Sequence, residues 1–362
     1  MLTTLFAAIL AIVPAVMPDW QNPGVVERNR LPMHASFTPA EQETIDLSGD
    51  WKFYFNETID GRLKGFEAAG YDDSAWGTIP VPGHWELNGF CDPMYLNIGY
   101  PWRGHVENNP PLTPTEHNYV GDYRTSFTVP AAWKGRQIVL CIGSATSNVR
   151  VWVNGKEVGY SQDSKLEARF DISKFVKPGS ENLLALEIFR WCDGTWLEDQ
   201  DFWRLSGIAR GIWLFARGPQ RLEDVHVRGG MDGSLDLMAE VTGGIASVEF
   251  TVTDAAGKEV AAYSASVPKK PERSASGNPV VRLSRKVTSP LLWSAETPNL
   301  YSLKVVARDK KGKVAESTTL RFGFRTVEVR QSQLFVNGKA ILVKGVNRHE
   351  LSPYYGYNVT RE

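Results

Sequence analysis

The sequence predicts an all-β protein built from two sandwiches, and three observations carry this prediction. Short runs of alternating apolar and polar residues, such as Trp51 to Phe55 and Tyr123 to Val129, recur along the chain between Gly, Pro and Asn-Gly. Few stretches of helical periodicity interrupt them. Asn154-Gly155 separates two such runs and is typical of a type I′ hairpin turn. Many short strands without helices indicate a sandwich or a jelly roll.

The chain begins with an apolar run from Leu2 to Val16, which is too short to cross a bilayer as an ordinary helix. Its length suits a secretory signal, and Val13-Pro14-Ala15 offers small residues for cleavage. No Lys or Arg precedes the run, so either the true start lies upstream or the run is not an export signal. We expect residues 1–18 to be a signal segment of a periplasmic or secreted protein. A cytoplasmic protein is the alternative.

The following residues divide into an arm and two sandwiches. Residues 19–45 are polar, contain Pro and show no period, so we expect an extended arm. Residues 46–217 hold the densest strand patterns and are predicted to form a jelly roll. A boundary falls near Gly218-Pro219. Residues 218–326, with two Gly-containing hairpin tips, have a length and pattern that suit an immunoglobulin-like sandwich.

Residues 327–362 form a third unit around a second Asn-Gly turn, Asn337-Gly338. The run after this turn, Ala340 to Lys344, leads into Gly345 to Glu350. A strand that ends in polar and charged residues is how a barrel strand delivers side chains to its C-terminal mouth. The alternative is a hairpin that ends in a loop, with His349 as an ordinary surface histidine.

Composition excludes some classes of function. The net charge of -1 argues against a nucleic-acid or anionic-membrane partner. The three cysteines are too few, and odd in number, for a disulfide framework, and Cys141 lies in an apolar run that predicts burial. No Cys/His cluster of metal-binding type is present. The 12 Trp and 12 Tyr residues suit either sugar-stacking surfaces or large core side chains.

Several segments, in order along nearly the whole chain, resemble glycoside hydrolase family 2 and in particular its long β-galactosidases. They are Asp19 to Pro23, Asn29 to Leu31, Leu47 to Phe53, Val81 to Trp85, Tyr95 to Pro101, Pro110 to Glu116, Val151 to Gly155, Val158 to Tyr160, Leu197 to Ile208, Leu292 to Glu296, Gly323 to Arg325 and Gly345 to Glu350. The resemblance implies a sugar-binding jelly roll, an immunoglobulin-like sandwich and the first strand of a TIM barrel. It also implies a retaining β-galactosidase.

The resemblance implies three sugar-binding residues. His349 matches a histidine that contacts the galactosyl unit and stabilises the transition state, since an imidazole can donate to a sugar hydroxyl. Asp201 matches a carboxylate that binds the sugar and a sodium ion, a hard cation that takes oxygen ligands. Asn97 matches a loop asparagine whose amide contacts the sugar. The alternatives without a binding role are a solvated acidic loop for Asp201 and a turn-forming residue for Asn97.

A second, structural metal site is also implied by the resemblance. Its oxygen donors would be Asp19, Asn22, the main-chain carbonyl of Val25, Gln162 and Asp193, which would hold Mg²⁺ and pin the arm to the jelly roll. In this family, arm residues also take part in assembly. A homo-oligomer is therefore the expectation for the full-length protein.

The catalytic pair is expected to be absent from these residues. Retaining glycosidases use two carboxylates about 5–5.5 Å apart, one as acid/base and one as nucleophile. The resemblance places both glutamates, and the active-site Mg²⁺ ligands, beyond Glu362. Glu350 is therefore not expected to be catalytic, and the 362 residues alone are expected to be inactive. The alternatives are a non-catalytic carbohydrate-binding fragment, or a β-glucuronidase or β-mannosidase relative.

One strand of an eight-stranded barrel cannot close, and the apolar residues Ile341, Val343 and Val346 would then lack partners. We therefore expect residues 328–362 to be loosely packed or docked on the second sandwich.

Overall fold

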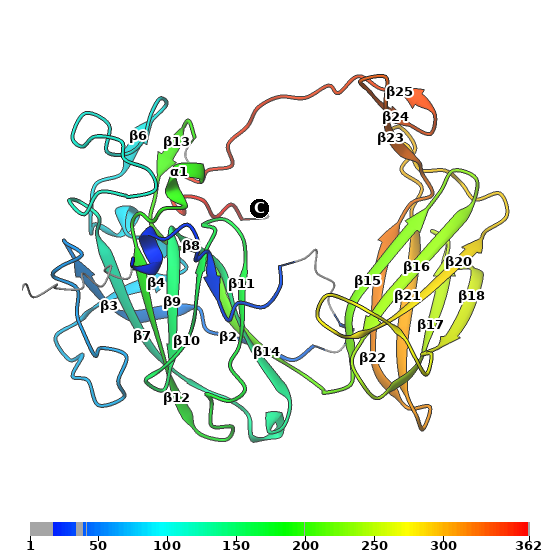
Figure 1. Ribbon diagram of the computed structural model, residues 1–362, viewed down its shortest axis with the longest axis horizontal. Helices are drawn as coiled ribbons and strands as arrows, with labels where there is room; N and C mark the ends of the chain where they lie inside the picture. The colour runs from blue at the N-terminus through cyan, green and yellow to red at the C-terminus, as the bar shows by residue number, and fades with distance from the viewer. Residues whose placement is uncertain (1–16, 34–38, 41, 199, 361–362) are drawn as a thin grey trace, which may run out of the picture.

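The computed structural model describes residues 17–33, 39–40, 42–198 and 200–360, and it consists of two β-sandwiches followed by a segment that returns to the first (Figure 1). The all-β prediction is confirmed. Helical turns are confined to η1 (Asp19–Gln21), η2 (Glu86–Asn88), η3 (Ala131–Trp133) and α1 (Thr195–Glu198) in the described part of the chain. Residues 1–16 of the predicted signal segment lie outside it. No helix that the structure describes is long and apolar enough to span a membrane.

The first sandwich packs a seven-stranded sheet against a five-stranded one. The larger sheet runs in the order β1 (Glu27–Arg28), β10 (Lys156–Gln162), β9 (Asn148–Val153), β12 (Glu181–Phe189), β7 (Val120–Thr128), β3 (Gly49–Asn56) and β4 (Gly77–Val81). The smaller sheet holds β11 (Ala168–Asp171), β8 (Gln137–Thr146), β14 (Gly207–Arg217) and β2 (Thr44–Asp46), with β5 (Gly83–His84) also paired to β14.

The expected hairpin at Asn154-Gly155 joins β9 to β10. Both residues have positive φ angles, 51° for Asn154 and 77° for Gly155, as a type I′ turn requires. The register of the turn sends alternate side chains of β9, namely Val149, Val151 and Val153, into the core.

Aromatic side chains fill the core of the first sandwich. Trp85, Tyr123 and Phe170 have no exposed surface, and Cys141 is equally buried, as predicted. Most tryptophans are therefore core side chains rather than sugar platforms. Of the described tryptophans, Trp203 is the exposed exception, at 38%.

The second sandwich has two four-stranded antiparallel sheets. One contains β15 (Leu222–Gly229), β16 (Ser234–Val241), β20 (Pro279–Lys286) and β19 (Glu272–Arg273), and the other β18 (Glu259–Ser266), β17 (Ile245–Thr253), β21 (Tyr301–Asp309) and β22 (Val314–Phe322). Alternate residues of β17, including Val248, Phe250 and Val252, are fully buried between the sheets. This alternation is the period-2 pattern of a half-buried strand.

An ion pair joins the two sandwiches where the chain passes between them. The Arg217 guanidinium, at the end of β14, lies 2.6 Å from a carboxylate oxygen of Glu316 on β22. The same carboxylate accepts a hydrogen bond from the main-chain N–H of Leu222. Both side chains are mostly buried, so this pair fixes the junction more firmly than an exposed pair would.

The last segment begins as a small antiparallel sheet of β23 (Val327–Arg330), β24 (Gln333–Val336) and β25 (Lys339–Ala340). The strand expected over Ala340 to Lys344 ends at Ala340, and residues 341–350 are extended and exposed. The Ile341 N–H bonds to the Leu334 carbonyl, and beyond it no strand in the described part of the chain accepts main-chain hydrogen bonds from this stretch. The expected barrel strand does not form here, and the hairpin-and-loop alternative describes this geometry.

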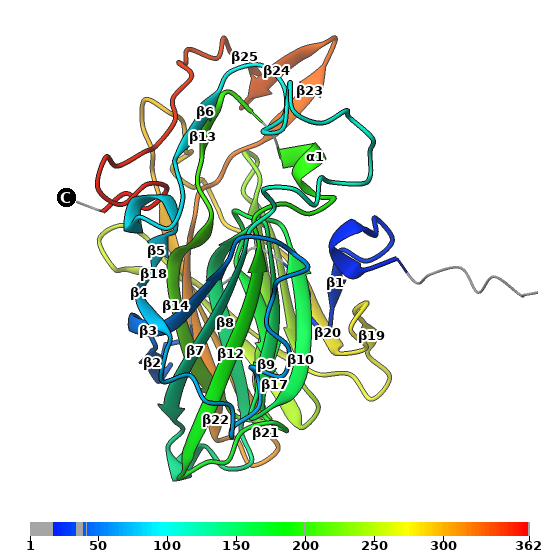
Figure 2. The ribbon, with the colours of Figure 1, turned by 90° about the vertical axis from the view of Figure 1, so that its left-hand side faces the viewer.

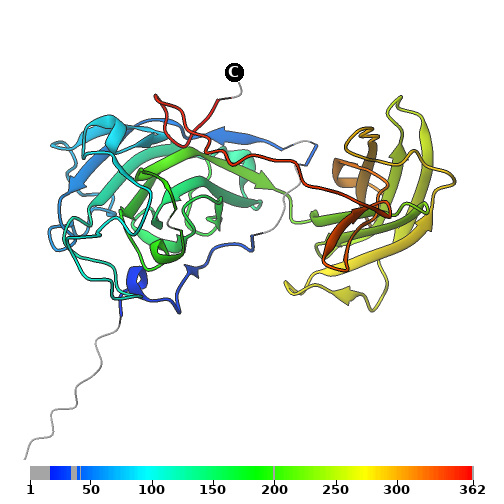
Figure 3. The ribbon, with the colours of Figure 1, turned by 90° about the horizontal axis from the view of Figure 1, so that it is seen from above.

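The expectation of loose packing holds for residues 341–350, where Leu342, Val343 and Val346 are 74–90% exposed. The expectation of docking on the second sandwich is wrong for the residues that follow. Seen from above, the segment crosses from the second sandwich back to the first (Figure 3). Tyr357 provides the reason, because its ring and hydroxyl find partners on the jelly roll.

Truncating the core of the second sandwich tests its packing. Phe250→Ala removes a fully buried ring and is expected to destabilise this sandwich by about 3–5 kcal/mol. Urea unfolding followed by the NMR signal of the Trp293 indole N–H reports it, because Trp293 is the single tryptophan of residues 218–326. Leu291→Ala, at a side chain that is 65% exposed, is the control and should leave the transition unmoved. Equal midpoints for the two variants would contradict the assigned core.

Candidate functional site

A two-stranded ribbon beyond the end of the first sandwich carries two of the predicted sugar-binding residues. It pairs β6 (Met94–Leu96) with β13 (Phe202–Arg204) and projects next to α1 (Figure 2). Leu96 lies opposite Phe202, so the antiparallel register places Asn97 and Asp201 at the same end of the ribbon. Both are exposed. The Tyr95 hydroxyl donates to Asp201 Oδ1 over 2.6 Å and holds this carboxylate at the ribbon surface.

The third predicted residue, His349, reaches the same ribbon from the far end of the chain. Its imidazole stacks on the Phe202 ring, with centroids 4.7 Å apart and planes 24° from parallel. Phe202 directly follows Asp201 in the sequence. The structure therefore brings Asn97, Asp201 and His349 to one end of one ribbon, although 252 positions separate Asn97 from His349 (349 − 97).

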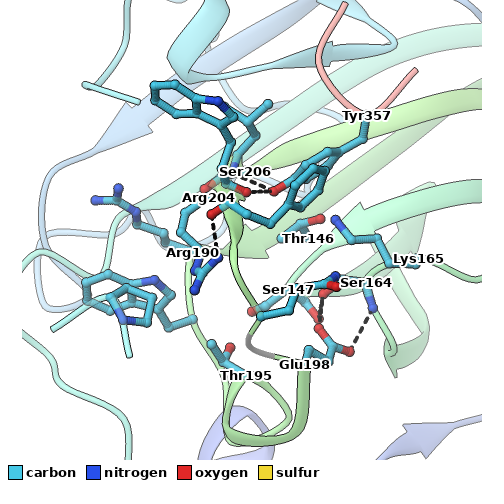
Figure 4. A pocket seen from close by; sticks show the side chains of 16 residues that line it. Thr146, Ser147, Ser164, Lys165, Arg190, Thr195, Glu198, Arg204, Ser206 and Tyr357 are labelled. Atoms are coloured by element: carbon cyan, nitrogen blue, oxygen red, sulfur yellow. Dashed lines mark hydrogen bonds between the residues drawn. The ribbon is translucent and has the colours of Figure 1, made fainter. Parts of the chain in front are cut away.

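Tyr357 packs on Phe202 and lines a small pocket of about 60 Å³ that is open to solvent on one side (Figure 4). Its ring stacks on Phe202 at 4.9 Å, and its hydroxyl donates to the Trp203 carbonyl and accepts from the Leu205 N–H. The Lys165 ammonium lies 3.3 Å from the centre of the same ring. Such a pocket has room for a few water molecules at most.

Ionisable groups under the ribbon are perturbed by burial. Desolvation lowers the pKa of Lys165 to about 8 and raises that of Glu198, whose carboxylate accepts from Ser164. Burial also raises the pKa of Glu86, whose Oε2 accepts from the Ser206 N–H. These groups form a polar base beneath the exposed residues of the ribbon.

His84 is held neutral between two partners. Its Nδ1 lies 3.0 Å from the Ser206 carbonyl and its Nε2 lies 3.2 Å from the Tyr357 main-chain N. A carbonyl accepts and an N–H donates, so Nδ1 carries the proton and Nε2 accepts. Burial lowers the pKa of this imidazole to about 4.

The structure brings three of the five predicted Mg²⁺ donors together. The Gln162 amide lies 2.7 Å from Asp193 Oδ1 and 3.5 Å from the Asp19 carbonyl. Asn22 and Val25 lie in the turn that follows, where Asn22 Oδ1 accepts from the Gly24 N–H. β1 pairs with β10 and holds this arm on the jelly roll.

The donor set fits a hard cation in part. Asp193 is buried and its carboxylate has a pKa raised by desolvation, which a cation would reverse. Turning the Gln162 amide would present its oxygen to the same point. The Asp19 carboxylate instead pairs with Arg28 and Arg150 at 2.7 and 2.9 Å. Among the described residues, no group of three or more His, Cys, Asp and Glu side chains could hold a metal ion.

Sequence reasoning missed Phe202, Tyr357, Lys165 and His84 as parts of this site. Phe202 lies within the Leu197 to Ile208 segment that carried the resemblance, so it could have been noted. Tyr357 had one weak signal, the cluster Tyr354-Tyr355-Gly356-Tyr357 directly after the His349 motif. His84 likewise lies within the resembling segment Val81 to Trp85. Nothing local marks Lys165, because only the fold brings it under the ribbon.

Comparison with protein families finds glycoside hydrolase family models that match most of the chain. Residues 45–218 match the family model described as glycosyl hydrolases family 2, sugar binding domain. Residues 220–325 match the model described as glycosyl hydrolases family 2, and residues 327–362 match its TIM barrel domain. The chain belongs to glycoside hydrolase family 2.

Curated relatives are similar over 95% of the chain. The chain is 36% identical to a β-galactosidase of Priestia megaterium, of which it covers 35%. It is 37% identical to a β-galactosidase of Photobacterium profundum, of which it covers 34%. The chain therefore spans about a third of the length of these relatives.

Solved structures share the fold at lower identity. A β-glucuronidase of Bacteroides uniformis superposes with a TM-score of 0.67 and 22% identity, over 88% of this chain and 37% of that one. A Ruminococcus gnavus β-glucuronidase complex gives a TM-score of 0.64 and 21% identity, over 91% and 53% of the two chains. This likeness shows the fold.

The neutral His84 predicts a loss of stability in acid. The unfolded state takes up a proton near pH 6.5, whereas the folded state takes it up only near pH 4. Stability therefore falls as the pH drops through this window, by up to about 3 kcal/mol, and is unaffected by His84 above it. Urea unfolding at pH 7 and pH 4.5 measures the loss. His84→Gln should show a smaller loss than the parent.

His226→Gln is the matched control, because His226 lies on the second sandwich with an exposed side chain. It should keep the full acid sensitivity of the parent. The same sensitivity in His84→Gln would contradict the assignment.

Proposed function

We propose that this chain is the N-terminal part of a retaining β-galactosidase that hydrolyses terminal non-reducing β-D-galactosyl residues. The observation that carries the proposal is the 36–37% identity to β-galactosidases along 95% of the chain. The gathering of Asn97, Asp201 and His349 at one end of the β6–β13 ribbon supports it. β-Galactoside sugars are the proposed partners.

Each of the three residues has a role that its chemistry allows. The exposed Asp201 carboxylate offers oxygen to a sugar hydroxyl and to Na⁺, the cation proposed for this position. The Asn97 amide can both donate to and accept from a hydroxyl. His349 donates from its imidazole to a hydroxyl as the ring becomes oxocarbenium-like.

Hydrolysis itself needs two further carboxylates, which we propose do not lie among these 362 residues. Glu350 follows His349, but its side chain is 62% exposed and lies 3.4 Å from the Arg348 guanidinium. A catalytic acid is instead expected in a site that excludes water. The active-site Mg²⁺ would belong with the missing carboxylates.

Two other readings have less support. A β-glucuronidase or β-mannosidase relative is disfavoured, because the identity to the β-glucuronidase structures is only 21–22%. A non-catalytic sugar-binding fragment would share the ribbon and differ only in biological role. We further propose a periplasmic or secreted location and a homo-oligomer in the full-length form.

Assays of the isolated chain test the proposal. The purified 362 residues are expected to give no turnover of aryl β-galactosides, whereas galactose with Na⁺ is expected to perturb the NMR resonances of the ribbon. Asp201→Asn should abolish the perturbation, and Asp232→Asn, at an exposed turn of the second sandwich, should leave it unchanged. Measurable turnover would refute the missing-carboxylate proposal. A response to glucuronate in place of galactose would favour the β-glucuronidase alternative.

The proposed structural Mg²⁺ site has its own test. Mg²⁺ at about 100 times its Kd is expected to raise the stability of the chain by about 2.7 kcal/mol, measured as a shift in melting temperature. Asp193→Ala should remove the shift, because it deletes the buried carboxylate. Asp232→Asn is again the control. An equal shift in Asp193→Ala would place the metal elsewhere.

A further inference from the structure

Residues 341–350 give His349 little support of their own. Val346 is 90% exposed, and the Arg348–Glu350 pair beside the histidine is exposed on both sides. An exposed pair of this kind contributes little to order. The position of His349 must therefore be set by contacts outside this stretch.

Two aromatic contacts converge on one ring. Phe202 is 9% exposed, and both His349 and Tyr357 stack on it in nearly parallel orientation, at 4.7 and 4.9 Å. Stacked aromatic pairs of this kind add to the stability that comes from the area they bury. Phe202 is thus shared by the predicted sugar-binding histidine and by a tyrosine eight residues further on.

Tyr357 contacts the jelly roll at several points, on and beside β13. Its hydroxyl bonds to the main chain at Trp203 and Leu205, on either side of Arg204. Its main-chain N–H donates to His84, and the Lys165 ammonium covers its ring. A cation over an aromatic face is attracted to the ring, and more strongly where both are desolvated.

The turn before Tyr357 is shaped for this docking. Ser352 and Gly356 exchange two main-chain hydrogen bonds of 2.8 and 2.9 Å. Gly356 has a φ of 62°, and a Cβ there would lie 2.4 Å from His84 Cδ2 and 2.7 Å from Leu205 Cδ1. Only glycine fits between the turn and the sandwich at this point.

We propose that Tyr357 is a positioning residue for His349: it anchors the 352–357 turn on β13 and, through the shared Phe202 ring, holds the imidazole at the same end of the ribbon as Asp201. The histidine's place in sugar binding rests on the function proposed above. Its placement by Tyr357 does not, because it follows from the contacts alone.

NMR of the His349 imidazole in the full 362-residue chain tests this placement. Stacking on Phe202 shifts the ring protons of His349 upfield. Tyr357→Ala keeps Phe202 and is expected to move these protons to the positions of a free histidine. Tyr354→Ala, at a side chain that is 81% exposed, is the matched control and should leave them unchanged.

Two further variants separate anchoring from general damage. Gly356→Ala keeps every ring but blocks the docking, and it should reproduce the loss of the upfield shift. Tyr357→Phe keeps the ring and loses the hydroxyl, so an intermediate shift is expected. The methyl resonances of Leu140 and Ile142, fully buried in the core of the first sandwich, report whether each variant is folded. An unchanged His349 signal in folded Tyr357→Ala or Gly356→Ala overturns the proposal.

A galactose titration of the same samples distinguishes the two proposals. Loss of the His349 shift together with weaker galactose binding supports both. Loss of the shift in the variants, together with no galactose binding by the parent chain, supports the positioning role and refutes the proposed sugar site.

Discussion

The pairing of β14 with β8 is the interaction on which both functional parts of the molecule depend. Its register runs from Gly207 opposite Thr146 to Arg217 opposite Gln137, and the core-facing Ile212 and Leu214 are fully buried. The start of β14 follows directly from the β6–β13 ribbon, and its end carries the ion pair to the second sandwich. A slip of one residue in this pair would turn the core side chains to the other face and displace both ends.

The ribbon combines an exposed rim with a buried polar base. Asn97 and Asp201 stay in contact with solvent, where a sugar could reach them, while His84, Lys165 and Glu198 lie beneath. Burying such groups is costly unless each has a partner, and Ser206, Tyr357 and Ser164 supply these partners. The resulting contacts hold these buried groups in place beneath the ribbon.

The fold was predictable from the sequence because it follows from local rules. Period-2 alternation predicted strands such as β7. Asn154-Gly155 predicted the β9–β10 hairpin, because the turn requires positive φ angles. The convergence of Asn97, Asp201 and His349 was expected from the family resemblance. No local sequence pattern predicts it. The expected strand over Ala340 to Lys344 failed because alternation supplies a strand only where a neighbour accepts its hydrogen bonds.

The sequence by itself determined the all-β class, the two sandwiches and the family, since these depend on periodicity, turn residues and motifs in order along the chain. Only the tertiary structure decided where the last residues go. Tyr357 finds its partners at His84, Lys165 and Trp203, which lie more than 150 positions away (357 − 203 = 154 for the nearest). Such partners become neighbours only after both sheets have packed, so docking on the first sandwich is a property of the folded surface.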